Sequence, residues 1–241
     1  MQRQGFVVEL KVGVAKVGKY ATSICGDSVE VVERPNGGIS VVIIDGQGHG
    51  RAAKRMSHMI ATKAAGLIED GARDGAVMRV INDHLYAFRD GQVSATATIL
   101  TADLDHDCLV ISRNSNTPVL IGLKDGSYSL DSPVEPIGIR RLIKPAISHL
   151  DLEEETILVG FTDGVTQAGR YGGVDTFKYS WVYNQLRNSI SSVQSLADDV
   201  LDYALALEGG KPQDDMVVAV LAVAGRQSDL GIRRISVSYP C

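Results

Sequence analysis

The stretch VVIIDGQGHG, residues 41–50, decides how the rest of the chain is interpreted. An apolar run ends at one carboxylate, Asp45, and three glycines and a histidine follow within five residues. A short acidic side chain at the end of a buried strand suits a metal or phosphate site, and it equally suits an ordinary turn. Partners for Asp45 elsewhere in the chain have to decide between the two.

The residues around this stretch predict a β-hairpin and then two helices. Residues 28–33 and 39–45 are rich in β-branched side chains and are separated by an Asn-Gly pair, which is a strong hairpin signal. Residues 52–70 carry apolar side chains at helical spacing, and 74–88 repeat the pattern with Asp74 as the expected cap.

Beyond these helices the chain returns to strands, then to two more helical patterns, and then to one last strand. The expected strands are 6–14, 93–104, 107–114, 117–126, 127–130, 155–165 and 214–223, and the two further helices are expected within 176–208. Helices that come in pairs argue against a doubly wound parallel sheet. They favour antiparallel sheets with helices stacked on the outside.

Length and charge limit the classes of protein. The 241 residues, 44% of them hydrophobic and 22% charged, suit one large domain with its own core. We expect a single domain over 1–224, followed at 225–241 by a tail or an added edge strand. The net charge of -5 provides no global basic field, so neither nucleic acid nor a membrane is an expected partner.

The cysteines and the N-terminal residues bear on the compartment. Cys25, Cys108 and Cys241 are scattered and show no C-x-x-C spacing, which disfavours a disulfide framework or a zinc-thiolate site. We see neither a signal-peptide pattern nor an apolar stretch of membrane-spanning length. A cytoplasmic protein is the expectation.

Several acidic residues share one placement, the tip of a β run: Asp27, Asp45, Asp163, and the pair Asp214 and Asp215. If these tips meet at one edge of the sheets, the carboxylates raise one another's pKa, and a divalent cation is the usual relief. An all-oxygen ligand set favours Mg²⁺ or Mn²⁺ over zinc.

Such a cluster has a definite chemistry. Gly46 has no side chain to obstruct the approach of its carbonyl to a metal. Four or five carboxylates could hold two ions roughly 3.5–4 Å apart, bridged by one shared aspartate. A water between two such ions loses its proton near neutral pH, which suits the cleavage of a phosphate monoester.

Taken singly, each piece has a plainer interpretation. These are turns at Asp45-Gly46, Asp125-Gly126 and Asp163-Gly164, a helix-start or surface residue at His49, a loop cap at Asp214-Asp215, and small packed side chains at Ser94 and Thr96. The joint pattern favours the site.

The ordered set of motifs resembles a known family. The set is GD (26–27), DGQGHGRAA (45–53), SATA (94–97), TDG (162–164) and QDDM (213–216). It is similar to the metal-dependent serine/threonine phosphatases of type 2C, and most similar to their bacterial SpoIIE branch, in which a D-x-x-G-H-G-x-x-A-A motif opens the first long helix. Within that branch the chain looks most like the short stand-alone phosphatases of the RsbX kind.

The resemblance implies an α+β fold, a four-layer αββα sandwich of two central antiparallel sheets flanked by helix pairs, with two Mn²⁺ or Mg²⁺ ions at one end. By motif match, Asp45 would bridge both ions, and metal-bound water would attack phosphorus directly. The other implied ligands are Asp27 and the Gly46 carbonyl for one ion, Asp163 and Asp214 for the other, and Asp215 as a support or as a ligand of a further ion.

The motif departs from the eukaryotic members in one respect. Gln47 occupies the place of their histidine, and His49 comes two residues later. In the eukaryotic members that histidine is a candidate acid for the leaving alkoxide. His49 is the candidate for this role here, with metal positioning and helix capping as alternatives. Arg51 and Arg55 are the nearest candidates for gripping phosphate.

The resemblance also implies substrates: phosphoserine or phosphothreonine on STAS-domain regulatory proteins of a stressosome-like complex. The glycine-rich segment 164–181 either selects the substrate or is a plain connection. Two alternatives remain, a phosphatase-fold scaffold without activity and a metallohydrolase of small phosphates or nucleotides. The second lacks a P-loop or G-x-G-x-x-G pattern.

Overall fold

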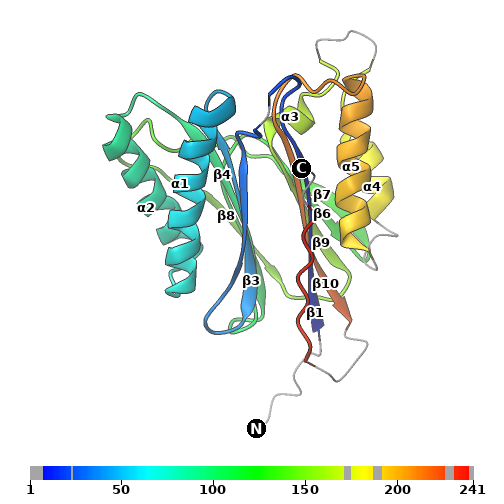
Figure 1. Cartoon of the computed structure of the whole chain (residues 1–241). Helices are drawn as coiled ribbons and strands as arrows, with labels where there is room; N and C mark the ends of the chain where they lie inside the picture. Colours follow the sequence, from blue (N-terminus) through cyan, green and yellow to red (C-terminus); the bar gives the residue numbers. More distant parts are fainter. Residues whose placement is uncertain (1–7, 23, 171–174, 187–191, 226–230, 239–241) are drawn as a thin grey trace.

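Two five-stranded antiparallel sheets lie face to face between two layers of helices (Figure 1). The computed structural model describes residues 8–22, 24–170, 175–186, 192–225 and 231–238. The predicted α+β four-layer sandwich of antiparallel sheets is confirmed, since the strand pairings among the described residues are antiparallel.

The first sheet has the strand order β2-β3-β4-β5-β8 and is covered by α1 and α2. Its strands are β2 Ser28–Glu33, β3 Gly38–Gly46, β4 Ala95–Asp103, β5 Cys108–Asn114 and β8 Ala146–Asp151, and its helices are α1 Gly50–Glu69 and α2 Asp74–Arg89.

The second sheet has the order β1-β10-β9-β6-β7 and is covered by α4 and α5. Its strands are β1 Val8–Val17, β6 Val119–Leu123, β7 Gly126–Leu130, β9 Thr156–Phe161 and β10 Met216–Gly225, and its helices are α3 Asp163–Thr166, α4 Tyr179–Leu186 and α5 Val193–Leu207.

The apolar run before Asp45 is buried on both faces of its sheet. Val42 and Ile44 pack against α1 and α2, whereas Val41 and Ile43 pack against the second sheet. Successive side chains of a strand point to opposite faces, so a strand covered on both sides needs apolar residues without alternation. This burial fixes β3 and, with it, the position of its acidic end.

Most of the predicted elements are present, and three details were wrong. β8 was not expected. The run predicted as a strand over 155–165 ends at Phe161 and gives way to α3. Asp74 does not cap α2: the N-cap is Arg73, and Asp74 is the first helical residue, paired with Arg34 at 3.0 Å.

Of the tail expected at 225–241, Gly225 is the last residue of β10, and residues 231–238 are exposed and form neither helix nor strand. Arg233 pairs there with Glu33 at the end of β2. Residues 171–174, which belong to the glycine-rich segment, lie outside the described residues. Within the described chain, no helix has both the length and the apolar character needed to span a membrane.

Candidate metal centre

The carboxylates expected from the motifs meet at one end of the sandwich. Asp45 lies at the end of β3, half-buried and opposite Thr96 of β4. Asp27 precedes β2 and is only 2% exposed. Asp163 opens α3 and is half-buried, whereas Asp214 precedes β10 and is exposed.

Asp45 is the central member of the group. Its carboxyl lies within hydrogen-bonding reach of those of Asp27 and Asp163. Burial, followed by the negative charges of Asp163 and Asp214, raises the pKa of Asp45 to about 7. Without a cation, this carboxyl therefore holds its proton far above the usual range.

Asp27 is the most buried of the four. Burial first, and then the charge of Asp45, raise its pKa well above the ordinary range, and a hydrogen bond from the Thr162 hydroxyl opposes the rise. The same hydroxyl accepts a hydrogen bond from the Val217 amide at 2.9 Å. Asp27 Oδ2 is buried without a hydrogen-bond partner among the described residues.

Asp163 is held by its own short helix. Gln167 Nε2 donates to Asp163 Oδ2 at 2.9 Å. Burial, and then the charge of Asp214, raise the pKa of Asp163. Thr162 and Gln167 therefore orient two of the four carboxylates. In the sequence Thr162 is visible only as part of the TDG motif, and no local pattern points to Gln167.

Helix α1 fixes the backbone around Asp27. Lys54 Nζ donates to the Asp27 carbonyl at 3.0 Å and to Ser28 Oγ at 2.9 Å. The Ser57 hydroxyl donates to the Gly26 carbonyl. Both side chains were missed from the sequence. The available signal was their place on the helix that follows the DGQGHG loop, one turn apart.

Gly46 has a packing reason to be glycine. An added Cβ would lie 3.0 Å from the Ala53 carbonyl oxygen and 3.2 Å from Met56 Cε. A side chain there would push α1 away from the end of β3. Gly48 and Gly50 meet open space, but their φ angles of +94° and +70° favour glycine.

Gln47 ties the glycine-rich loop to β4. Its Oε1 accepts hydrogen bonds from the Ser94 amide at 3.0 Å and from the Ser94 hydroxyl at 3.3 Å. Ser94, directly before β4, therefore holds this loop through both its amide and its hydroxyl.

His49 is the N-cap residue of α1, with extended backbone angles. Its side chain is exposed and makes no capping hydrogen bond, so capping by the imidazole is not its role. Arg51 and Arg55 are also exposed.

Asp215 is buried, with 3% of its surface exposed. Its Oδ1 accepts from the Lys19 amide at 2.9 Å, and its Oδ2 accepts from the Gly26 amide at 2.8 Å. Both of its oxygens therefore face the backbone of the loop between β1 and β2, whereas Asp214 is exposed.

The family model for Stage II sporulation protein E (SpoIIE) matches residues 35–224, most of the chain. The chain belongs to the SpoIIE family. No curated protein sequence matches this SpoIIE-family chain closely enough to count as a relative.

Solved structures support the fold of this SpoIIE-family chain. The PP2C phosphatase domain of SpoIIE from Bacillus subtilis, with a fragment of its regulatory domain, is 20% identical with a TM-score of 0.79; the match covers 92% of this chain and 65% of that one. RsbX in complex with magnesium is 17% identical with a TM-score of 0.70, covering 90% and 98%. The serine/threonine phosphatase of S. agalactiae is 15% identical with a TM-score of 0.71, covering 89% and 99%. The predicted phosphatase fold is thus confirmed, and so is the predicted SpoIIE branch.

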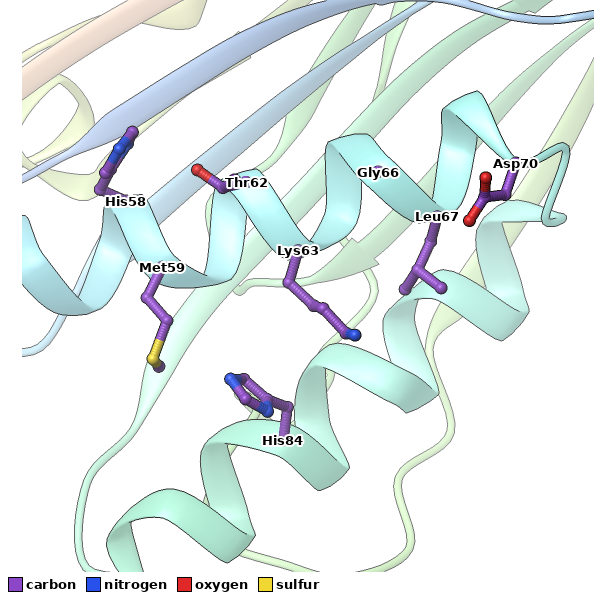
Figure 2. A pocket seen from close by; sticks show the side chains of 8 residues that line it. All are labelled: His58, Met59, Thr62, Lys63, Gly66, Leu67, Asp70 and His84. Carbon is purple, nitrogen blue, oxygen red and sulfur yellow. The ribbon is translucent and has the colours of Figure 1, made fainter.

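A groove on this SpoIIE-family chain lies away from the carboxylates. It runs between α1 and α2, encloses about 560 Å³, and contains none of the predicted site residues. Figure 2 shows His84 of α2 pointing toward Met59 and Lys63 of α1 across it. The four carboxylates lie instead at one end of the sandwich, where only Asp214 is exposed.

Proposed function

We propose that this chain is a Mn²⁺- or Mg²⁺-dependent protein serine/threonine phosphatase. The observation that carries the proposal is the convergence of four carboxylates at one end of the fold, three of which have a raised pKa. Within the described residues, none of the four forms an ion pair with a lysine, arginine or histidine. Buried carboxylates without a protein cation favour a cation from solution.

The donor set suits such an ion. All of the groups offer oxygen, which Mg²⁺ and Mn²⁺ prefer, and the unpartnered Oδ2 of Asp27 is a free acceptor. In the described part of the chain, no three acidic, histidine or cysteine side chains are already arranged to hold a metal ion. Binding therefore requires side chains to close on the ion, and the exposed Asp214 has the most freedom to do so.

We assign the ligands as the motifs predict. Asp45, Asp27 and the Gly46 carbonyl would hold one ion, and Asp45, Asp163 and Asp214 would hold the other. Such ions supply Lewis acidity toward a phosphoryl oxygen and lower the pKa of water. Thr162 keeps Asp27 oriented and Gln167 keeps Asp163 oriented, which limits how far these two ligands have to move when an ion binds. His49 as the acid for the leaving alkoxide stays a prediction.

We further propose phosphoserine or phosphothreonine on STAS-domain regulatory proteins as the substrates, acting in the cytoplasm. Likeness to the phosphatase domain of SpoIIE and to RsbX supports this class. The magnesium in the RsbX complex supports the choice of metal. The segment 164–181 borders Asp163 and is the proposed region of substrate selection.

The test is phosphate release from p-nitrophenyl phosphate and from phosphorylated casein, with Mn²⁺, with Mg²⁺ and with EDTA. Asp45→Asn should lower the metal-dependent rate by about 10³-fold or more, the scale of removing a preorganised charge-stabilising group. Asp125→Asn is the matched control, since Asp125 is exposed in the turn that joins β6 to β7.

Near-normal turnover by Asp45→Asn would refute the bridging assignment. Silence of the native chain on both substrates, with metal demonstrably bound, would favour the phosphatase-fold binding protein.

A further inference from the structure

Asp215 lies where the three segments that carry the proposed ligands Asp27, Asp163 and Asp214 come together. Gly26 directly precedes Asp27, and its amide donates to Asp215 Oδ2. The Asp215 amide donates to Asp214 Oδ1 at 2.9 Å. A Cβ added to Gly164, the residue after Asp163, would lie 2.1 Å from the Asp215 carbonyl oxygen. One residue thus touches the immediate neighbours of three proposed ligands.

We propose that Asp215 is a positioning residue that sets the spacing of Asp27, Asp163 and Asp214, and that it is not itself a metal ligand. The inference rests on the proposed function, because it concerns the same site. It decides between the two roles that the motifs leave open for Asp215, a support of the other ligands and a ligand of a further ion.

The carboxylate is already in use. Its two oxygens accept the amides of Lys19 and Gly26, which lie in the loop between β1 and β2. Buried backbone N–H groups need a partner, and a carboxylate is a stronger acceptor than a neutral oxygen. A turn of this side chain toward a metal ion would break at least one of these hydrogen bonds in a site that is 3% exposed.

Other contacts clasp the same two segments. The Tyr20 amide donates to the Pro212 carbonyl at 2.8 Å, and Lys211 Nζ lies 5.4 Å from the centre of the Tyr20 ring. At Gly26, an added Cβ would lie 2.7 Å from Asp215 Oδ2. Gly26 is therefore glycine because Asp215 comes so close, and the loop before Asp27 is fitted to this carboxylate.

Asparagine is the informative replacement. It keeps the shape of Asp215 but offers one acceptor oxygen, and its amide nitrogen would face a backbone N–H donor. Either Lys19 or Gly26 would lose its partner, so that the loop carrying Asp27 would shift relative to Asp214.

The experiment is Mn²⁺ titration of the whole chain by isothermal calorimetry, well below its unfolding temperature. Asp215→Asn should weaken Mn²⁺ binding by roughly 10- to 100-fold, as loss of a group that supports a ligand does, with the number of bound ions unchanged. Asp214→Asn is the comparison for a true ligand, and exposed Asp199→Asn on α5 is the matched control with no change.

The outcomes separate cleanly. Loss of a bound ion in Asp215→Asn would make it a ligand and overturn the proposal. A lower melting temperature with unchanged Mn²⁺ affinity would reduce Asp215 to a general structural role and would also overturn it. If the native chain binds no Mn²⁺, the proposed function itself fails together with the inference.

A measurement on the native chain covers the case in which Asp215→Asn does not fold. Amide hydrogen exchange at Lys19 and Gly26 should be slow in the metal-free protein and stay slow when Mg²⁺ is added. Faster exchange of either amide on Mg²⁺ binding would mean that the carboxylate leaves the loop for the ion, contrary to the proposal.

Discussion

A buried aspartate lies near each end of β2, and only one of the two has an ion-pair partner among the described residues. Beyond its last residue, Arg34 NH1 lies 3.0 Å from Asp74 Oδ1 and also donates to Ser40 Oγ at 2.9 Å. Before its first residue, Asp27 is equally buried but meets other carboxylates, without an ion-pair partner among the described residues.

The two ends also differ in which groups oppose the rise in pKa that burial causes. Burial raises the pKa of Asp74, and the Thr101 hydroxyl and the charge of Arg34 pull it down. At Asp45, burial and the surrounding charges act mainly in the same direction. At the end of β2 where Asp74 joins the strand to α2, Arg34 thus supplies the neutralising cation. At the other end the fold leaves a concentration of negative charge that a dissolved cation relieves.

Breaking the ion pair gives the largest expected effect on stability. Arg34→Met should lower the free energy of unfolding by about 3–5 kcal/mol, because it leaves Asp74 buried without its cation. Urea unfolding measures this. The double variant Arg34→Met, Asp74→Leu should recover most of the loss, since replacing both partners by apolar groups is often neutral.

The affinity for Mn²⁺ should stay unchanged in the folded Arg34→Met protein, because the pair lies at the opposite end of β2. A small stability change in Arg34→Met, or an equal loss in the double variant, would contradict the role given to this ion pair.

The carboxylate end predicts an unusual response of the metal-free protein to pH. The folded pKa of Asp45 is about 7 against an ordinary 3.8, so the folded chain keeps a proton that the unfolded chain releases. The stability from this group is fully present below about pH 4 and is lost as the pH rises through about 7. One such group changes stability by at most about 1.4 kcal/mol per pH unit in that window, and the raised pKa values of Asp27 and Asp163 act in the same direction.

In EDTA, the urea midpoint should therefore fall between pH 5 and pH 8. Asp45→Asn should flatten the fall and Asp125→Asn should not, and Mg²⁺ should restore stability at pH 8. A midpoint in EDTA that rises over this interval would contradict the clustering of the carboxylates.

The fold could be predicted from the sequence where a run or a periodic set of apolar residues is buried. The unbroken run before Asp45 and the paired helical patterns were enough to predict β3, α1 and α2. β8 was missed because its residues alternate between half-buried and exposed at the sheet edge, and its only strand partner among the described residues is β5. Pairing across the sheet, rather than local pattern, makes this segment a strand.

The candidate site was predictable in its carboxylates and not in their supports. An aspartate at each strand tip is visible in one dimension, because a strand end has a recognisable sequence. The supporting contacts join segments that lie far apart in the chain. They run from Lys54 to Asp27, from Gln47 to Ser94, and from Asp215 to the loop before β2. Nothing in local spacing encodes them.

The smallest expected effect is that of replacing His49, the N-cap residue of α1 next to the acidic end. His49→Ala should change the free energy of unfolding by less than about 0.5 kcal/mol, since the side chain is exposed and makes no capping hydrogen bond. Phosphate release from p-nitrophenyl phosphate at neutral pH should fall by less than about tenfold for the same reason. A loss of roughly 10²- to 10⁴-fold with a missing limb in the pH–rate profile would instead make His49 the general acid, and it would extend the functional end of the molecule beyond its carboxylates.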